Sequence, residues 1–392
     1  MVSKSKISEY IPFAVNMVEQ GSLTINSLVL NFLVFSIFVS GSIQLYQAIA
    51  ITIIISVTST LVNAFSTWRI LDHDNPEKVE IVCVEIILIG VVCLIAGVIF
   101  NYWVPVPNVS WLGLGGLFFV ASTFYFLRDV LVYLKSISVL IVINVSTLLP
   151  LAVIFYIHIN GEEAFGVWSF FQWVFLYPRL LVVFFLVFFI TKVWDRFSIS
   201  FNRIKFSSQP FLRAAASISV AVRVHAPYFL LNAFGLALFA ELYRKFFLML
   251  SPVSQVLQAN YAFFLPRKDN MQMLAPSLFL SSVVGIVGAF VLKVFFWGEG
   301  GGLLLYAFIT FVSLLMCFRA YYFVLNRIER GYSREIYLSS LMIIVGAIYV
   351  YNLESGMPDY YVAHIFIINE VVYLAVALLF NGTRGRVFLR SM

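Results

Sequence analysis

Residues 171–189 read FQWVFLYPRLLVVFFLVFF, an apolar run in which Arg179 is the one charged residue. A helix needs about 20 such residues to cross the roughly 30 Å of hydrocarbon in a bilayer, so the run has the length of one membrane-spanning helix. A strand of a membrane barrel would be shorter and would alternate between apolar and polar residues. The stretch therefore predicts an α-helical membrane protein, with Pro178 and Arg179 near the middle of one span.

Runs of the same kind fill the rest of the chain. Of its 392 residues, 62% are hydrophobic and 11% are charged, whereas a soluble domain is about half apolar and a quarter charged. The fold class that we predict is all-α integral membrane, with about twelve transmembrane helices. The predicted spans are 24–40, 43–64, 79–100, 110–127, 133–156, 168–194, 216–238, 243–264, 274–296, 303–325, 336–351 and 361–380.

Lys and Arg residues are unevenly divided between the two sides of this topology. If the N-terminus lies in the cytoplasm, the termini and the inner loops hold 20 of the 25 Lys and Arg residues. Cytoplasmic loops carry such an excess, so the division supports twelve spans with both termini cytoplasmic. The net charge of +6 is mostly this inside bias, and it implies no nucleic-acid partner.

The longest charged loop, residues 195–215, divides the spans into two sets of six. We therefore predict an N-terminal lobe over 1–194, a cytoplasmic inter-lobe loop over 195–215 and a C-terminal lobe over 216–392. Two blocks with an even number of spans have the same orientation, so an axis along the membrane normal relates them. This is a common transporter plan, in which the substrate path lies between the lobes.

Three segments resemble a known family. They are AAASISVAVRVHAPYFLLNAFGLALFAELYRKFFLMLSPVSQVLQANYAFFLPRK (214–268), NSLVLNFLVFSIFVSGSIQLYQAIAITIII (26–55) and FYFLRDVLVYLKSISVLIVINV (124–145). Together they resemble Wzx-type O-antigen and polysaccharide flippases of the MATE/MOP transporter superfamily. The positions in 214–268 that carry the resemblance are Arg223, His225, Gly235, Ala240, Tyr243, Arg244 and Pro266.

The resemblance implies two six-helix lobes in the bacterial cytoplasmic (inner) membrane. It implies a flippase that works by alternating access and has no enzymatic activity and no cofactor. The cargo would be an oligosaccharide on undecaprenyl diphosphate, moved from the inner to the outer leaflet for O-antigen or similar lipopolysaccharide biosynthesis. The implied partners are this lipid-linked oligosaccharide, membrane lipids, a coupling H+ or Na+, and a polysaccharide polymerase complex.

Buried cations are the candidate substrate-binding residues. A charge that faces lipid costs about 2.5–3.5 kcal/mol or more, so mid-span charges usually face a wet cavity or a partner. Arg179 and Arg223 have the guanidinium that makes forked bonds to phosphate, and Arg244 occupies the cavity position that the resemblance implies. The alternative for Arg179 is a structural role, in which its side chain satisfies the carbonyl that Pro178 leaves free.

Three titratable residues are candidates for ion coupling. Glu370, mid-way along its span, is either an ion or proton site or the fixed partner of an Arg in the same half. Glu85 lies less than two turns into the third span, where it can reach the cytoplasmic interface. His225 is either a proton-responsive group or a packing histidine, and a position two residues from Arg223 does not share its helix face. Arg319 is expected to anchor the inner end of its span.

The four histidines and three cysteines show no metal-ligand or disulfide spacing, so no metal site is expected.

Two other classes of function remain open, namely a membrane enzyme and a small-molecule antiporter. A polysaccharide polymerase or ligase would need a sizeable outer loop, and the longest here, residues 157–167, offers only His158, Glu162 and Glu163 as charged or titratable side chains. A small-molecule or drug antiporter of the same superfamily would favour a cavity with more acids than the mid-span charges supply.

Overall fold

The computed structural model describes most of the chain. The described residues are 25–62, 79–133, 137–161, 165–192, 197–200, 208–264, 274–297, 302–328, 331–354, 357–358 and 360–380. They fall into two compact units, one formed by Asn26–Ile218 and the other by the residues from Ser219 onward. These are called the N-unit and the C-unit.

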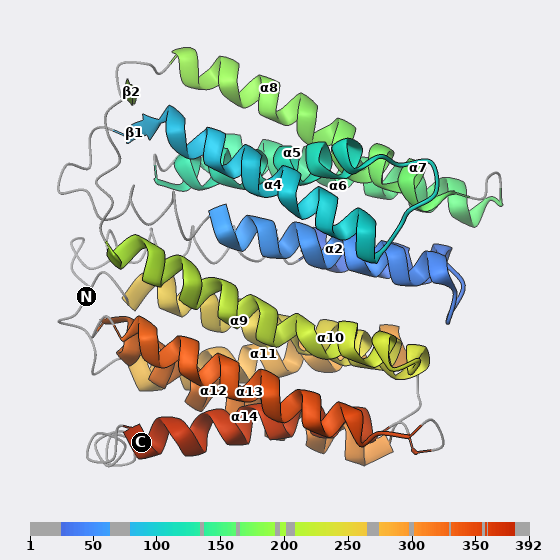
Figure 1. Cartoon of the computed structure of the whole chain (residues 1–392), viewed down its shortest axis with the longest axis vertical. Coiled ribbons are helices and arrows are strands. Elements are labelled where there is room, and N and C mark those ends of the chain that lie inside the picture. The colour runs from blue at the N-terminus through green and yellow to red at the C-terminus, as the bar shows by residue number, and fades with distance from the viewer. Residues whose placement is uncertain are drawn as a thin grey trace, which may run out of the picture. The chain divides into compact units, whose positions relative to one another are not determined.

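The N-unit is a group of long helices with one short pair of strands (Figure 1). Its first helix covers Ile25–Ile37. The elements that follow are α2 (Ile43–Val62), β1 (Val79–Val82), α4 (Cys83–Trp103), α5 (Trp111–Tyr133), α6 (Ile137–Ile159), α7 (Val167–Phe171), the π-helix η2 (Gln172–Leu176), α8 (Tyr177–Lys192), β2 (Phe197–Ser200) and the first part of α9 (Ser208–Ala233).

The C-unit holds the rest of α9 and five further helices, which run roughly along one common direction within the unit (Figure 1). They are α10 (Ala237–Phe264), α11 (Leu274–Trp297), α12 (Gly302–Ile328), α13 (Tyr332–Tyr351) and α14 (Tyr361–Phe380). Within this unit α10 packs most extensively against α11, and α14 contacts α10, α12 and α13.

The helices confirm the predicted fold class. Among the described residues, nine helices are long and apolar enough to span a membrane, and Ile25–Ile37 and Ile89–Trp103 are shorter apolar helices. The remaining long helix, α10, carries Glu241, Arg244 and Lys245 near its start, which breaks its apolar run. With α7, η2 and α8 counted as one broken crossing, the described helices coincide with the twelve predicted spans.

Two local features differ from the sequence-based expectation. The third span begins with a strand, because β1 (Val79–Val82) pairs in parallel with β2 (Phe197–Ser200) before α4 starts at Cys83. The sequence VEIV is rich in β-branched residues, which favours this extended start. Helix α9 begins at Ser208, earlier than predicted, because Pro210 fits a first helical turn and an Ala-rich segment follows it.

Close helix packing builds the interior of each unit. In the N-unit, a Cβ added at Gly97 of α4 would lie 2.6 Å from the backbone nitrogen of Gly115 in α5. In the C-unit, a Cβ added at Gly285 of α11 would lie 2.6 Å from the Cα of Val253 in α10. Small residues allow such close approach in membrane helices, where packing replaces the hydrophobic effect between helices.

Candidate functional site

Arg179 lies where the crossing from α7 to α8 changes its helical geometry. The N–H of Tyr177 donates to the carbonyl of Gln172, a bond five residues back that widens the turn into the π-helix η2. Pro178 follows and has no N–H to donate, which explains why the regular bonding pattern is interrupted here. Single π-turns inside α-helices occur frequently at functional sites. The predicted mid-span Pro–Arg pair therefore coincides with a local break in the helix.

The Arg179 side chain is buried inside the N-unit, with 6% of the residue exposed. Its guanidinium lies over the ring of Phe175, 3.2 Å from the centroid, and 5.3 Å from the centroid of Phe124 in α5. Nη1 is 3.5 Å from the carbonyl oxygen of Phe175, which is long for a hydrogen bond. Nε has no hydrogen-bond partner among the described residues. The arginine is thus held by aromatic rings and retains hydrogen-bonding capacity.

Arg223 is the corresponding buried arginine of the C-unit, with 4% of the residue exposed. Its Nη1 is 3.5 Å from the sulfur of Met342, and its guanidinium lies 5.6 Å from the ring centroid of Tyr373. Neither Arg223 nor Arg179 forms an ion pair with a carboxylate among the described residues. Arg223 nevertheless lies within electrostatic reach of Glu335 and Glu370.

Four buried residues and the half-buried Arg319 form a group that we call the ionic cluster of the C-unit. They are Arg223 of α9, Arg319 of α12, Glu335 of α13, and Glu370 and Tyr373 of α14. Nε of Arg319 lies 2.9 Å from Oε2 of Glu370, and the hydroxyl of Tyr373 donates to Oε1 of Glu335 at 2.9 Å. Glu335 and Tyr373 have no exposed surface. Two arginines and two glutamates make the cluster formally neutral.

A second grouping surrounds Phe247 on α10. The ring of His225 lies 5.4 Å from the Phe247 ring at an angle of 63°, and the guanidinium of Arg244 lies 5.0 Å from the same ring. The hydroxyl of Tyr243 donates to the carbonyl of Val224 at 2.7 Å, which fixes α10 against α9. His225 and Arg244, two positions that carried the family resemblance, are therefore neighbours in the fold, and both are buried.

The predicted site residues are thus distributed over three places. Arg179 lies in the N-unit, Arg223 and Glu370 share the ionic cluster, and Arg244 and His225 both lie against Phe247. Glu85 lies in α4, but its side chain is outside the described residues. Among the described residues, no group of three or more His, Cys, Asp or Glu side chains could hold a metal ion.

Sequence reasoning missed three members of the ionic cluster. Glu335 lies one residue before the predicted span 336–351, whereas in the structure it is the fourth residue of α13 and fully buried. Tyr373 is uncharged, so nothing in the sequence distinguishes it from the other aromatic residues of the spans. Arg319, predicted as an inner-side anchor, forms an ion pair with Glu370. The available signal was the single acid, Glu370, inside the predicted spans of a half that also holds Arg223 and Arg319 in its spans.

No protein-family profile and no curated protein matches this sequence. Solved structures do match over almost the whole chain. One is a MOP superfamily transporter from Pyrococcus furiosus, described as having a binding pocket of reversed polarity. It has a TM-score of 0.62 and 14% identity, and the match covers 96% of this chain and 95% of that one.

Two MATE structures match to a similar degree. A MATE in a bent conformation gives a TM-score of 0.56 with 14% identity over 98% of this chain and 96% of its own. A multidrug-resistance MATE family transporter of the MOP superfamily, in an outward-facing conformation, gives 0.58 with 13% identity over 98% and 97%. The chain therefore has the fold seen in MOP superfamily transporters. At these identities the similarity defines the fold and leaves the cargo open.

Proposed function

We propose that this protein is a MOP-type flippase that moves an undecaprenyl-diphosphate-linked oligosaccharide from the inner to the outer leaflet of a bacterial cytoplasmic membrane. The observation that carries the proposal is the pair of buried arginines, Arg179 in the N-unit and Arg223 in the C-unit, neither ion-paired with a carboxylate among the described residues. Buried charges inside spans are expensive and mark substrate pathways. An anionic head group would supply the countercharge that Arg179 lacks among the described residues.

The chemistry of the cargo suits guanidinium groups. A diphosphate carries negative charge on several oxygens, and Arg binds phosphate through two parallel hydrogen bonds. Arg244, buried beside Phe247, is a third cation that we assign to the binding of the head group. These residues compensate charge and select by shape, and no covalent step is assigned to the protein. The fold supports alternating access, in which the binding site opens to one side of the membrane at a time.

Ion coupling is assigned first to Glu370, which belongs to the same ionic cluster as Arg223. Glu370 is paired with Arg319, so a proton or Na+ that binds the carboxylate would release the Arg319 guanidinium. Such an exchange would change the positive charge available beside Arg223. His225 and Glu85 are the remaining coupling candidates, and the polymerase complex is the proposed downstream partner.

Transport by the purified protein tests the proposal. The wild type is reconstituted into proteoliposomes with fluorescent undecaprenyl-diphosphate N-acetylglucosamine, and translocation is followed by protection of the fluorophore from an external quencher. Arg179→Gln and Arg223→Gln should each reduce the rate by about tenfold or more, since a charged hydrogen bond contributes about 1.5–3 kcal/mol. Arg334→Gln, at an exposed cation near the start of α13, serves as the matched control and should leave the rate unchanged.

Transport of an anionic cargo or of a cationic one distinguishes this proposal from a drug antiporter of the same superfamily. A proton-driven or Na+-driven efflux of the cationic dye ethidium, with no translocation of the lipid-linked sugar, would replace the flippase by an antiporter. Translocation of the lipid-linked sugar without ethidium transport supports the flippase. Unchanged translocation in both Arg→Gln variants would contradict the role of the buried arginines.

A further inference from the structure

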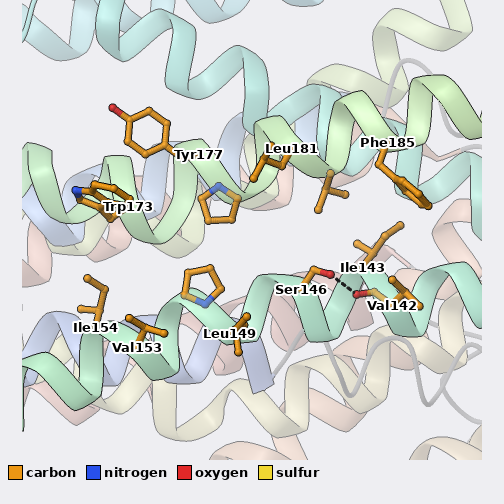
Figure 2. Close-up of a pocket in the computed structure, with 13 residues that line it drawn as sticks. Val142, Ile143, Ser146, Leu149, Val153, Ile154, Trp173, Tyr177, Leu181 and Phe185 are labelled. Atoms are coloured by element: carbon orange, nitrogen blue, oxygen red, sulfur yellow. Dashed lines mark hydrogen bonds between the residues drawn. The ribbon is translucent and has the colours of Figure 1, made fainter.

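An apolar groove runs along the N-unit between α6 and the η2–α8 segment (Figure 2). It encloses a volume of about 560 Å³. One end lies at Ile154 and Trp173 and the other at Val142 and Phe185, as Figure 2 shows. The remaining lining residues are Ile143, Ser146, Leu149, Pro150, Val153, Tyr177, Pro178, Leu181 and Val182.

The lining offers almost nothing polar to a ligand. Ser146 has the one aliphatic hydroxyl in the lining, and its Oγ donates to the carbonyl of Val142 on its own helix at 2.8 Å. Trp173 and Tyr177 contribute rings that meet edge to face with centroids 5.4 Å apart. An occupant therefore has to be a hydrocarbon, because a polar molecule would lose its hydrogen bonds to water without replacement.

Each of the two helices contributes a proline to the groove. Pro150 on α6 and Pro178 on α8 both line it, and each interrupts the hydrogen bonding of its own helix. The π-turn before Pro178 shifts the following residues around the helix, which places Tyr177, Leu181 and Phe185 along one side. The groove thus includes residues of the same break in the helix that precedes Arg179.

The groove lies at membrane depth and is open to the outside of the N-unit. Its residues fall within the spanning windows Val142–Ile159 and Val167–Leu186. From Val142 to Ile154 it extends about 18 Å along α6, more than half of the roughly 30 Å hydrocarbon core. Leu149 and Leu181 are 66% and 71% exposed, so the groove can be entered from its open side.

We propose that this groove binds the polyprenyl tail of the transported lipid, an inference that rests on the proposed function. Arg179 follows the lining residues Tyr177 and Pro178 directly, while its guanidinium lies toward Phe124 of α5. The cation and the groove therefore flank the same turn of α8. The charged head group of a bilayer phospholipid stays at the membrane interface, away from a cation in the middle of a span. The diphosphate of a transported lipid passes through that depth, where it can meet Arg179.

Photolabelling of the full-length protein in nanodiscs tests the inference. One probe is undecaprenyl-diphosphate N-acetylglucosamine with a photoreactive group at the end of its prenyl chain, and the other is phosphatidylglycerol with a photoreactive acyl chain. The prenyl probe should label peptides containing 142–154 and 173–185 in a saturable way. Unlabelled undecaprenyl phosphate should compete, and excess phosphatidylglycerol should not.

Variants that fill the groove should reduce this labelling. Leu181→Trp, and independently Ser146→Leu from the α6 side, should each lower labelling by the prenyl probe about tenfold. Val294→Trp, at a residue 57% exposed on α11 in the C-unit, is the matched control for an added exposed ring and should have no effect. Gel filtration and thermal unfolding of each variant identify any that fails to fold, and the other filling variant then decides.

The possible outcomes distinguish a failure of the prenyl-tail inference from a failure of the proposed flippase function. Equal or non-saturable labelling by both probes, or unchanged labelling in a folded groove-filled variant, overturns the inference even when the wild type translocates the lipid-linked sugar. Saturable labelling of the groove by the prenyl probe alone supports it. If that labelling occurs and the same lipid is not translocated in vesicles, the groove remains a prenyl-lipid site and the proposed function fails.

Discussion

The two units bury their arginines in different surroundings. Arg179 of the N-unit is enclosed by the rings of Phe175 and Phe124 and has an unpaired Nε among the described residues. Arg223 of the C-unit belongs to the ionic cluster, in which two arginines and two carboxylates balance one another. The contrast indicates a division of roles, with an N-unit cation held ready for an external anion and a C-unit cation whose charge is balanced internally.

Glu335 should give the largest change in stability. It is fully buried and accepts the hydroxyl of Tyr373, so Glu335→Ala leaves Tyr373 without its acceptor and two arginines facing one carboxylate. Breaking such a buried arrangement should lower the free energy of unfolding by about 3–5 kcal/mol, measured by reversible unfolding in SDS-containing mixed micelles. Glu354→Ala, at an exposed acid just after α13, should change it by less than about 0.5 kcal/mol. Equal effects of the two substitutions would remove the electrostatic role of the cluster.

The Arg319–Glu370 pair should show strong coupling. Arg319→Gln and Glu370→Gln should each lower the free energy of unfolding by about 2 kcal/mol, because each leaves a largely buried charge without its partner. The double variant should lose about 1–3 kcal/mol less than the sum of the single variants. Glu241 and Lys245, paired at 2.7 Å along α10 with Lys245 more exposed, form a control cycle with coupling of about 0.5 kcal/mol. Independent effects of Arg319 and Glu370 would contradict the cluster as described.

Helix packing should not distinguish the two units. Gly97→Ala in the N-unit and Gly285→Ala in the C-unit each place a Cβ against a neighbouring backbone, so each should lower the free energy of unfolding by about 1–3 kcal/mol. Gly116→Ala meets no atom within 4 Å and should be neutral or slightly stabilising, because Ala favours helix over Gly. If Gly97→Ala were as harmless as Gly116→Ala, the close contact between α4 and α5 would be wrong.

Arg179→Leu should give the smallest change in stability, with the opposite sign. An apolar side chain removes a buried charge that has no carboxylate partner among the described residues, so the free energy of unfolding should rise by about 1 kcal/mol. Arg223→Leu should lower it, since the cluster would lose a positive charge and become negative. A loss of stability in both variants, by the same amount, would eliminate the proposed division between the units.

The fold could be predicted from the sequence because bilayer thickness sets the length of each apolar run. The run at 171–189 became α7, η2 and α8, and Arg179 is buried near the middle of that crossing. The pairing of β1 with β2 was not predicted, because it joins four-residue segments more than a hundred positions apart. The π-turn also escaped prediction, although Pro178 marked the place where regular bonding had to fail.

The candidate site was predictable only in part, because helical position does not determine what a side chain meets on neighbouring helices. A charge in the middle of a span marks Arg223 and Glu370 as candidate site residues. The side chain that each of them contacts depends on how its helix is rotated in the bundle. Glu370 was predicted to be either an ion or proton site or the partner of an Arg in the same half, and the structure places Arg319 against it as such a partner. Tyr373 has no sequence signal of its own, and it became visible only through its bond to Glu335.

The most direct test of the central claim is the affinity of the purified protein for undecaprenyl diphosphate, compared between the wild type and Arg179→Leu in the same nanodiscs. A buried cation that serves an external anion predicts binding about tenfold weaker or worse in the variant, together with its unchanged or raised stability. An unchanged affinity in a folded Arg179→Leu protein would contradict the account.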